Sequence, residues 1–386
     1  MSQRDDERAK VETQPRRPDP AVRTVAVLGA GHGGCAAAAD LTRRGFRVRL
    51  HARSEARLAP LRERGGVEAR GVQTGLVPLA DLTTDVAEAI DGADLIMLVV
   101  PSVAHEHYAR ALASLLGPDR PVFLNPGHTG GALHFVHELR RAGYRDEVPA
   151  CETVTLTYIC RMEGPATVGI YSYVRRLRFA AFPGRHAERL HALVQPLYPE
   201  ILPAASVLET ALSNMNAVFH PPGMLMNAGW IESTGGGFLF YREGITEAVG
   251  RVVAAVDAER LAIARALGVP ARSFLDSFFE AGLTTPEAHA SGSIARACRE
   301  SGPNATIRAP SSLDHRYVHE DVGYGLVPFA AFGRLAGVPT PTIDALVHLA
   351  SEAAGIRYGE TGLTLEKMGL AGKRPEALAR FLLDGR

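Results

Sequence analysis

The chain has 386 residues, of which 46% are hydrophobic and 22% charged, and its formal net charge is zero. This composition indicates a globular protein of about two domains, and the balanced charge gives no reason to expect nucleic acid or a membrane surface as a partner. The longest apolar runs are too short to cross a bilayer.

The first part of the chain alternates buried strands with helices. Residues 1–21 are polar and lack the apolar core of a signal peptide, so we expect a disordered tail. Apolar runs that end in glycine or proline, or carry β-branched residues, predict strands at 22–30, 47–54, 93–102 and 120–127, with helices between them. This alternation predicts an α/β fold, a Rossmann-type doubly wound parallel sheet with ligands at the carboxyl ends of its strands.

The second part of the chain has helical periodicity. The segments TVGIYSY and RLRFAAFP, within 150–183, are interpreted as closing strands of the same sheet. Apolar residues then recur at helical spacing in 244–268, and further helices are expected at 271–281, 328–337 and 342–355. We therefore expect the tail at 1–21, a dinucleotide-binding domain at 22–200, and a mostly α-helical substrate and catalytic domain at 201–386, with a cleft between the two domains.

Cysteine, histidine and lysine usage narrows the chemistry. The four cysteines are scattered without a C-x-x-C pair, which favours a reducing cytoplasm over a disulfide framework. Close histidine pairs lack a third ligand, so no metal site is expected. Lysine occurs only at positions 10, 367 and 373, so a lysine acid or base in the interior is excluded.

The string GAGHGG places glycines at positions 29, 31 and 34 in the G-x-G-x-x-G spacing, between a strand and a helix. Such glycines allow a tight turn and a close approach of the backbone to a pyrophosphate, and the helix N-terminus offers free N–H donors. The sequence therefore predicts dinucleotide binding by residues of this turn and of the strand ends: Gly29, Gly31, His32, Gly34, Arg53, Pro101 and Pro126.

The second strand ends in LHARS, where Arg53 stands instead of the acid that usually binds the ribose of NAD. Arginine suits a 2′-phosphate, so NADP(H) is the expected cofactor. NAD(H) stays possible if Glu55 or a water-mediated contact serves the ribose.

The segment NAVFHPPGMLMNAGW places His220 before Pro221 and Pro222. Two prolines predict the end of a helix, which would let the ring face the cleft as a proton donor. The alternative is a core histidine with a satisfied hydrogen bond. A second segment, DHRYVHEDVGYGLVPF, gathers charged residues that could orient the ring and bind a carboxylate, unless it forms a solvated loop.

The sequence resembles the octopine/nopaline dehydrogenases, the opine dehydrogenase family, whose two-domain plan is like that of 6-phosphogluconate dehydrogenase. The resemblance covers nearly the whole chain after the tail. It lies in GAGHGG, NPGHTGGALHF, CETVTLTYICR, LETALSNMNAVFHPPGMLMNAG and HRYVHEDVGYGLVP, of which the last two are the most specific. In that family a His–Asp pair and an arginine five residues before the aspartate carry the chemistry. The matching residues are His220, Asp321 and Arg316.

The resemblance implies the reductive condensation of an amino acid with a 2-oxo acid through an imine. His220 would move the proton, Asp321 would orient and charge it, and Arg316 would bind a carboxylate. Asn227 could reach the substrate or hold backbone, and Tyr158 could contact substrate or serve packing. The partners expected are these small molecules, and a homodimer is possible.

Two other functions stay open from the residues alone. One is an NAD(P)-dependent dehydrogenase of a simple hydroxy acid or a polyol phosphate, since the same two-domain plan hosts both. The other is a dinucleotide-sensing protein without turnover.

Overall fold

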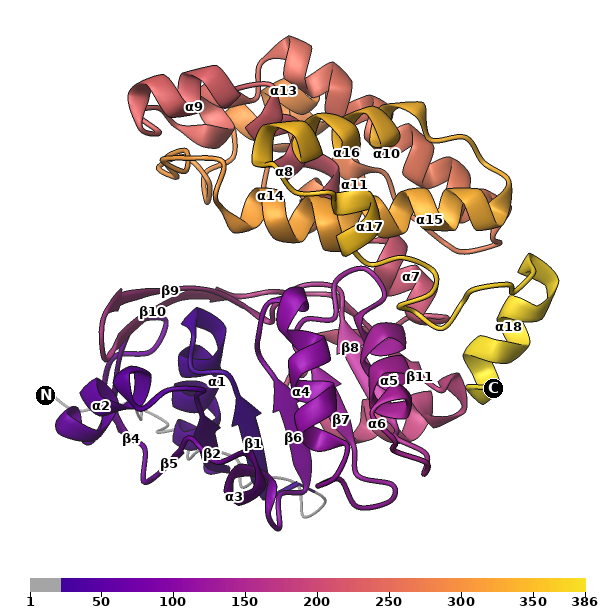
Figure 1. Ribbon diagram of the computed structural model, residues 1–386. Helices are drawn as coiled ribbons and strands as arrows, with labels where there is room; N and C mark the ends of the chain where they lie inside the picture. The colour runs from indigo at the N-terminus through magenta and orange to yellow at the C-terminus, as the bar shows by residue number, and fades with distance from the viewer. Residues whose placement is uncertain (1–21) are drawn as a thin grey trace, which may run out of the picture.

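The computed structural model describes residues 22–386, so the expected tail lies outside the described residues. A sheet-bearing half lies below a helical half in Figure 1. The main sheet has eight strands in the order β12-β11-β8-β7-β6-β1-β2-β5. Its strands are β1 (Thr24–Leu28), β2 (Arg47–His51), β5 (Asp81–Thr83), β6 (Leu95–Leu98), β7 (Val122–Leu124), β8 (Ala150–Thr153), β11 (Leu177–Phe182) and β12 (Ile201–Pro203).

All neighbours in this sheet are parallel except β8 and β11. The expected Rossmann-type sheet is thus confirmed, with one antiparallel pair near an edge. Helices cover both faces: α1 (His32–Arg43), α2 (Glu55–Arg64), α3 (Val86–Ile90), α4 (His105–Leu112), α5 (Gly131–Arg141) and α6 (Ala187–Val194). Short 3-10 turns, η1 (Ser102–Ala104) and η2 (Gly184–His186), follow β6 and β11.

Alternate residues of the buried strands serve two apolar cores, because successive side chains point to opposite faces of a sheet. Val25 and Val27 of β1 pack with the Ala-rich helix α1. Ala26 and Leu28 belong to the core of α4 and α5, which continues into the helical half. The two halves therefore share one apolar interior on that side of the sheet.

The expectation that TVGIYSY closes the main sheet is wrong. This segment is β10 (Thr167–Tyr173), and it belongs to a separate four-stranded sheet in the order β4-β3-β10-β9. The other strands are β3 (Gly66–Gly71), β4 (Gly75–Pro78) and β9 (Tyr158–Gly164). β10 pairs in parallel with β3, a distant part of the chain, and such a partner is set by long-range packing rather than by local pattern.

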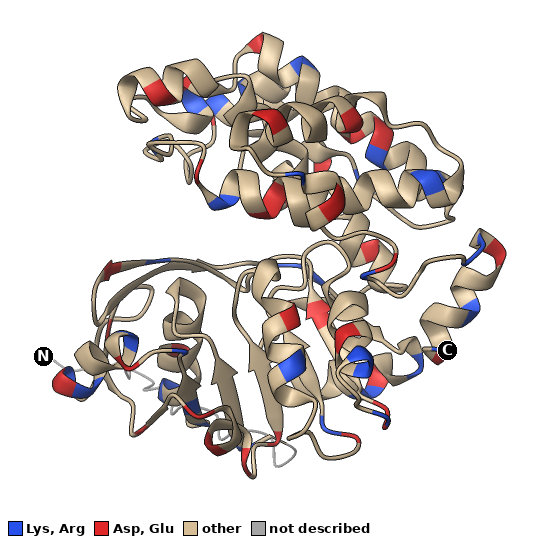
Figure 2. Ribbon diagram, in the orientation of Figure 1, with Lys and Arg blue, Asp and Glu red and all other residues tan. Residues whose placement is uncertain are grey.

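The helices expected from the periodicity of the second part of the chain are confirmed in the helical half. Its helices are α7 (Val207–Leu212), α8 (Asn216–Leu225), α9 (Ala228–Thr234), α10 (Glu247–Ala266), α11 (Phe274–Glu280), α12 (Pro286–Ala290), α13 (Ile294–Arg299), α14 (Arg316–Asp321), α15 (Val327–Ala336), α16 (Pro341–Ala354) and α17 (Tyr358–Thr361). Two π-helical turns, η3 (Phe240–Gly244) and η4 (Val322–Leu326), lie among them. Acidic and basic residues are interspersed over both halves (Figure 2).

The last helix, α18 (Pro375–Asp384), returns to the sheet-bearing half (Figure 1). There Phe381 packs on Phe182 with ring centroids 5.3 Å apart, and Arg140 donates a hydrogen bond to the carbonyl of Gly385 at 2.8 Å. Within residues 22–386, no helix has the length and apolar character needed to cross a membrane.

Candidate active site

The glycine turn between β1 and α1 has the shape that a dinucleotide phosphate requires. Gly29 has a φ of +116°, and a Cβ there would meet the carbonyl oxygen of Val99 at 2.4 Å. A Cβ at Gly34 would lie 1.6 Å from the backbone oxygen of Gly29, whereas one at Gly31 would meet no protein atom within 4 Å. The first turn of α1 has no side-chain cap. Close packing on one side and free N–H donors on the other fit the phosphates of NAD(P).

The other residues expected to bind the cofactor lie around this turn or at the carboxyl ends of neighbouring strands. His32 opens α1, and its Nδ1 accepts a hydrogen bond from the backbone N–H of Met162 in β9 at 2.7 Å. Arg53 is exposed just after β2. Pro101 leads from β6 into η1, and Pro126 follows β7.

The expectation that Pro221 and Pro222 end a helix is wrong. Both lie inside α8, which continues to Leu225. Each proline removes a backbone hydrogen bond, at a local cost of roughly 3 kcal/mol in a helix interior. However, all residues from Ala217 to Met224 are buried, and α8 packs on α10, α14, α16 and η4. Tertiary packing therefore outweighs the local preference.

α8 brings His220 to Asp321, 101 residues later in the chain. The Nδ1 atom of His220 lies 2.7 Å from Oδ2 of Asp321, and both side chains are buried. α8 and η4, the turn that directly follows Asp321, can approach closely because η4 carries Gly325, where a Cβ would lie 2.6 Å from the Cβ of Ala217. The structure thus brings together the two residues that the resemblance paired.

Aromatic rings enclose His220. Tyr317 stacks on the imidazole with ring centroids 3.6 Å apart, and the hydroxyl of Tyr241 lies 3.2 Å from Nε2. Burial lowers the pKa of His220, and Asp321 opposes this effect, but the pKa stays below its ordinary value. An ionised carboxylate can only accept, so Nδ1 carries the proton and Nε2 is left as an acceptor.

Arg316 begins α14, one turn before Asp321. Its Nε and Nη2 atoms lie 3.1 Å and 2.8 Å from Oε2 of Glu320. The arginine side chain is 56% exposed, while that of Glu320 is 4% exposed. Arg316 is therefore fixed by a buried carboxylate and still open to a ligand.

Asn227 and Tyr158 have contacts within the protein. The amide nitrogen of Asn227 donates to the carbonyls of Gly223 and Gly244 at 2.8 Å and 2.9 Å, which ties α8 to η3. These bonds favour the backbone role over contact with a substrate.

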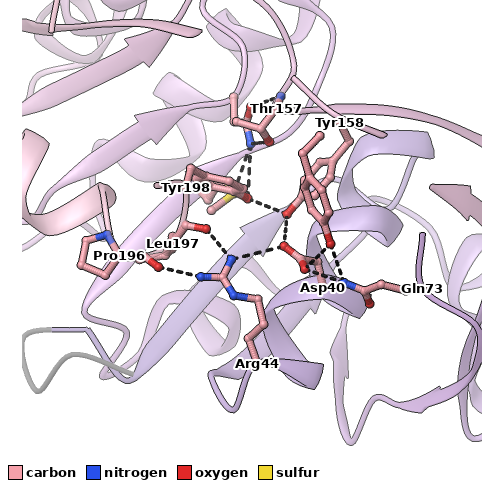
Figure 3. A network of polar contacts seen from close by, with 11 residues as sticks. Asp40, Arg44, Gln73, Thr157, Tyr158, Pro196, Leu197 and Tyr198 are labelled. Carbon is pink, nitrogen blue, oxygen red and sulfur yellow. Dashed lines mark hydrogen bonds and ion pairs between the residues drawn. The ribbon is translucent and has the colours of Figure 1, made fainter. Parts of the chain in front are cut away.

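The hydroxyl of Tyr158 donates to Asp40 of α1 at 2.9 Å and also contacts the hydroxyl of Tyr198 at 3.0 Å (Figure 3). Tyr173 and Gln73 donate to the other oxygen of Asp40 at 3.0 Å and 2.6 Å. These contacts attach the small sheet to α1 and favour the packing role of Tyr158.

Sequence reasoning missed several polar residues near the pair. Tyr241 and Tyr317 contact the imidazole, and Glu320 holds Arg316. Glu320 stands within a charged segment that the sequence singled out, so its position was a signal, but its partners were not readable. In residues 22–386, no group of three or more His, Cys, Asp or Glu side chains could hold a metal ion.

Comparisons with known proteins bear on this geometry. Residues 203–354 match the family described as NAD/NADP octopine/nopaline dehydrogenase, alpha-helical domain, and residues 24–135 match the N-terminus of NAD-dependent glycerol-3-phosphate dehydrogenase. An opine dehydrogenase from Arthrobacter sp. (strain 1C) is 37% identical over 353 residues, which cover 91% of this chain and 96% of that protein. This chain belongs to the opine dehydrogenase family. It is an NAD(P)-dependent oxidoreductase of that family.

Further similar proteins match more than nine-tenths of the chain. A vitopine synthase from Allorhizobium ampelinum is 29% identical over 371 residues, covering 91% of this chain and 96% of that protein. A structure of octopine dehydrogenase in complex with NADH and agmatine superposes with a TM-score of 0.74 at 20% identity, covering 94% and 98% of the two chains. Yersinopine dehydrogenase with NADP+ bound gives 0.69 at 17% identity and the same coverage. At these identities the structures show a shared fold.

Proposed function

We propose that this opine dehydrogenase family member condenses an amino acid with a 2-oxo acid. The amino group adds to the carbonyl carbon, water leaves to give an imine, and a hydride and a proton then give an N-(carboxyalkyl) amino acid. NADPH, when bound at the glycine turn, supplies the hydride. The observation that supports this proposal is the His220–Asp321 pair, whose Nδ1 and Oδ2 atoms lie 2.7 Å apart. Arg316 lies on α14, the same helix as Asp321.

His220 is the proton-moving group in this proposal. Because burial keeps the ring neutral, its Nε2 can accept the proton that the amino group loses on addition. The ring then returns a proton to the hydroxyl group that leaves as water. Asp321 holds the Nδ1 proton and stabilises the charge that the ring carries between these steps.

Arg316 is proposed to bind the carboxylate of the 2-oxo acid. Its planar guanidinium suits a two-point contact with a carboxylate, and Glu320 fixes its direction. Octopine dehydrogenase structures hold L-arginine in one case and pyruvate in another. These two compounds are therefore the first substrates to test here.

NADP(H) is proposed as the preferred cofactor because Arg53 is exposed at the end of β2, where a 2′-phosphate would lie. The described cysteines are all free thiols, and we place the reaction in the reducing cytoplasm.

The activity test measures oxidation of NADPH with a panel of 2-oxo acids, each with and without a panel of amino acids, and identifies the product by mass. We expect oxidation that requires both substrates, and slower oxidation of NADH. Oxidation that does not need the amine would instead support a simple carbonyl reductase. A clear preference for NADH would contradict the assignment of Arg53.

The residue test compares His220→Gln and Asp321→Asn with His319→Gln. His319 lies on α14, as Asp321 does, but it contacts Tyr358 and Asp314. We expect the first two changes to lower kcat about 10²- to 10⁴-fold, the usual contribution of a positioned acid–base group, with NADPH affinity retained. His319→Gln should keep most of the activity. Nearly full turnover in either of the first two variants would remove that residue from the mechanism.

A further inference from the structure

Glu320 is a buried carboxylate that takes no part in the proposed proton transfer but has contacts beyond the one with Arg316. Its Oε1 atom accepts a hydrogen bond from the backbone N–H of Ser102 at 2.9 Å, and Nε2 of His128 lies 3.5 Å away. Its Oε2 atom binds the guanidinium of Arg316 at 2.8 Å. One side chain therefore contacts three residues from three separate segments of the chain.

The partners of Glu320 come from both halves of the molecule. Ser102 opens η1 just after β6, and His128 follows β7, so both lie at the carboxyl edge of the parallel sheet. Glu320 and Arg316 lie on α14 of the helical half. The carboxylate thus joins that edge, where a parallel sheet binds its ligands, to the helix that carries Asp321.

The charges around Glu320 make Arg316 its cationic partner. Burial lowers the pKa of His128, and burial lowers the pKa of His105, also near Glu320, to about 4, so both rings are neutral near pH 7. Burial alone would raise the pKa of Glu320, but two positive charges lower it below its usual range: that of the His128 ring, which is protonated only in acid, where Glu320 itself titrates, and that of Arg316, which is present at every pH. A buried charge that loses its partner is strongly unfavourable, so the ion pair constrains both side chains.

We propose that Glu320 is a positioning residue for the reaction. By its contact with the Ser102 amide it fixes α14 on the carboxyl edge of the sheet, and by its contact with Arg316 it aims the guanidinium at the substrate carboxylate. It thereby sets the position of Asp321, the next residue of α14, and so the contact of Asp321 with His220. The kinetic part of this inference rests on the proposed function.

Two substitutions separate the two contacts. Glu320→Gln keeps an oxygen that can accept from the Ser102 amide but loses the ion pair with Arg316. We expect the KM for the 2-oxo acid to rise about tenfold, since a hydrogen bond to a charged group is lost, with kcat changed little. Glu320→Ala loses both contacts, and we expect kcat to fall about 100-fold as well, because α14 shifts relative to the cofactor site.

Glu138 offers a matched control. It is a buried carboxylate, 2% exposed, that binds the 59% exposed Arg141 at 2.9 Å, and both residues lie on α5. Glu138→Gln therefore removes a similar ion pair on a helix that carries none of His220, Arg316 and Asp321. We expect its kinetic constants to equal those of the wild type.

Hydrogen exchange of the cofactor-free protein gives a readout that does not need turnover. In Glu320→Ala, exchange of the Ser102 amide should become about tenfold faster, since its acceptor is lost, while Glu320→Gln and Glu138→Gln should exchange as the wild type does. Unchanged exchange in Glu320→Ala would overturn the inference. So would wild-type kcat and KM in both Glu320 variants with only a lower Tm. If the wild type shows no amine-dependent oxidation, the proposed function fails, and the exchange result alone decides on Glu320.

Discussion

At His220, burial and a neighbouring carboxylate act on the same ring in opposite directions. Asp321 favours the charged imidazolium, as the sequence led us to expect, but burial among Tyr241, Tyr317 and other aromatic residues has the larger effect. The ring is therefore neutral before substrate binds, and in the proposed reaction it acts first as a proton acceptor. The family resemblance suggested the pair, but the degree of burial depends on residues that lie elsewhere in the chain.

Glu152 is another buried group whose pKa is shifted by its surroundings. This buried carboxyl accepts hydrogen bonds from the Ala132 amide at 2.7 Å and from the Thr210 hydroxyl, yet burial raises its pKa to about 7. Its folded pKa lies above the unfolded one, so its contribution to stability is present below about pH 4.5 and is lost as pH rises through about 7. Since Gln cannot ionise, we expect Glu152→Gln to exceed the wild type by up to about 3 kcal/mol in free energy of unfolding at pH 8, with little difference at pH 4.5.

Urea unfolding at the two pH values measures this difference for Glu152. The exposed Glu63 supplies a control, and Glu63→Gln should follow the wild type at both pH values. A difference between Glu152→Gln and the wild type that does not change with pH would contradict the assigned role of burial.

The resemblance, rather than a local pattern, indicated which residues of the candidate site lie together. His220, Asp321 and Arg316 followed from the resemblance. Glu320 and His128 did not, because their contact joins segments almost 200 residues apart. A buried polar contact between two halves of a chain leaves no local pattern.

For strands and helices, the ends of strands could be predicted from the sequence more accurately than the ends of helices. Glycine and proline correctly marked the ends of β1, β6 and β7, because the chain turns there at the sheet edge. The same rule failed at α8, where Pro221 and Pro222 lie inside a helix that packing stabilises on several sides. It also gave no sign of the hairpin of β3 and β4, whose pairing with β10 depends on long-range contacts.

The turn before α1 leads to a prediction about two glycines. A Cβ at Gly34 would collide with the Gly29 backbone, so we expect Gly34→Ala to lower the free energy of unfolding by at least about 2 kcal/mol. A Cβ at Gly31 would meet no protein atom within 4 Å, and its φ of −80° suits alanine. Gly31→Ala should therefore keep stability within about 1 kcal/mol. It should weaken NADPH binding about tenfold or more, because the added methyl group occupies the path of the phosphates.

Thermal unfolding and NADPH fluorescence titration distinguish these effects. Each variant controls the other, since one should lose stability and the other affinity. Unaltered NADPH affinity in Gly31→Ala would contradict the placement of the phosphates at this turn.

For the whole molecule, the response of stability to acid depends on buried histidines in the shared apolar interior. Burial lowers the pKa of His105 to about 4 and that of His134 to about 3. Their folded pKa values lie below the unfolded value of 6.5, so their contribution to stability is present above pH 6.5 and is lost as pH falls toward these values. We expect the stability of His134→Phe relative to wild type to increase by about 2 kcal/mol between pH 7 and pH 5.

Urea unfolding across this pH range measures the effect of His134. His348 is exposed, and His348→Gln should follow the wild type at every pH. A constant offset between His134→Phe and the wild type would show that the ring does not resist protonation in the folded state.

The Asp40 contacts also constrain how the molecule can move as it works. Hydrogen bonds to Asp40 from Tyr158, Tyr173 and Gln73 attach the small sheet to α1. The Met162 amide on β9 donates a further hydrogen bond to His32, at the start of the same helix. These contacts hold the glycine turn and the small sheet together on α1. A change in the relative position of the two halves would therefore displace the glycine turn and the small sheet together.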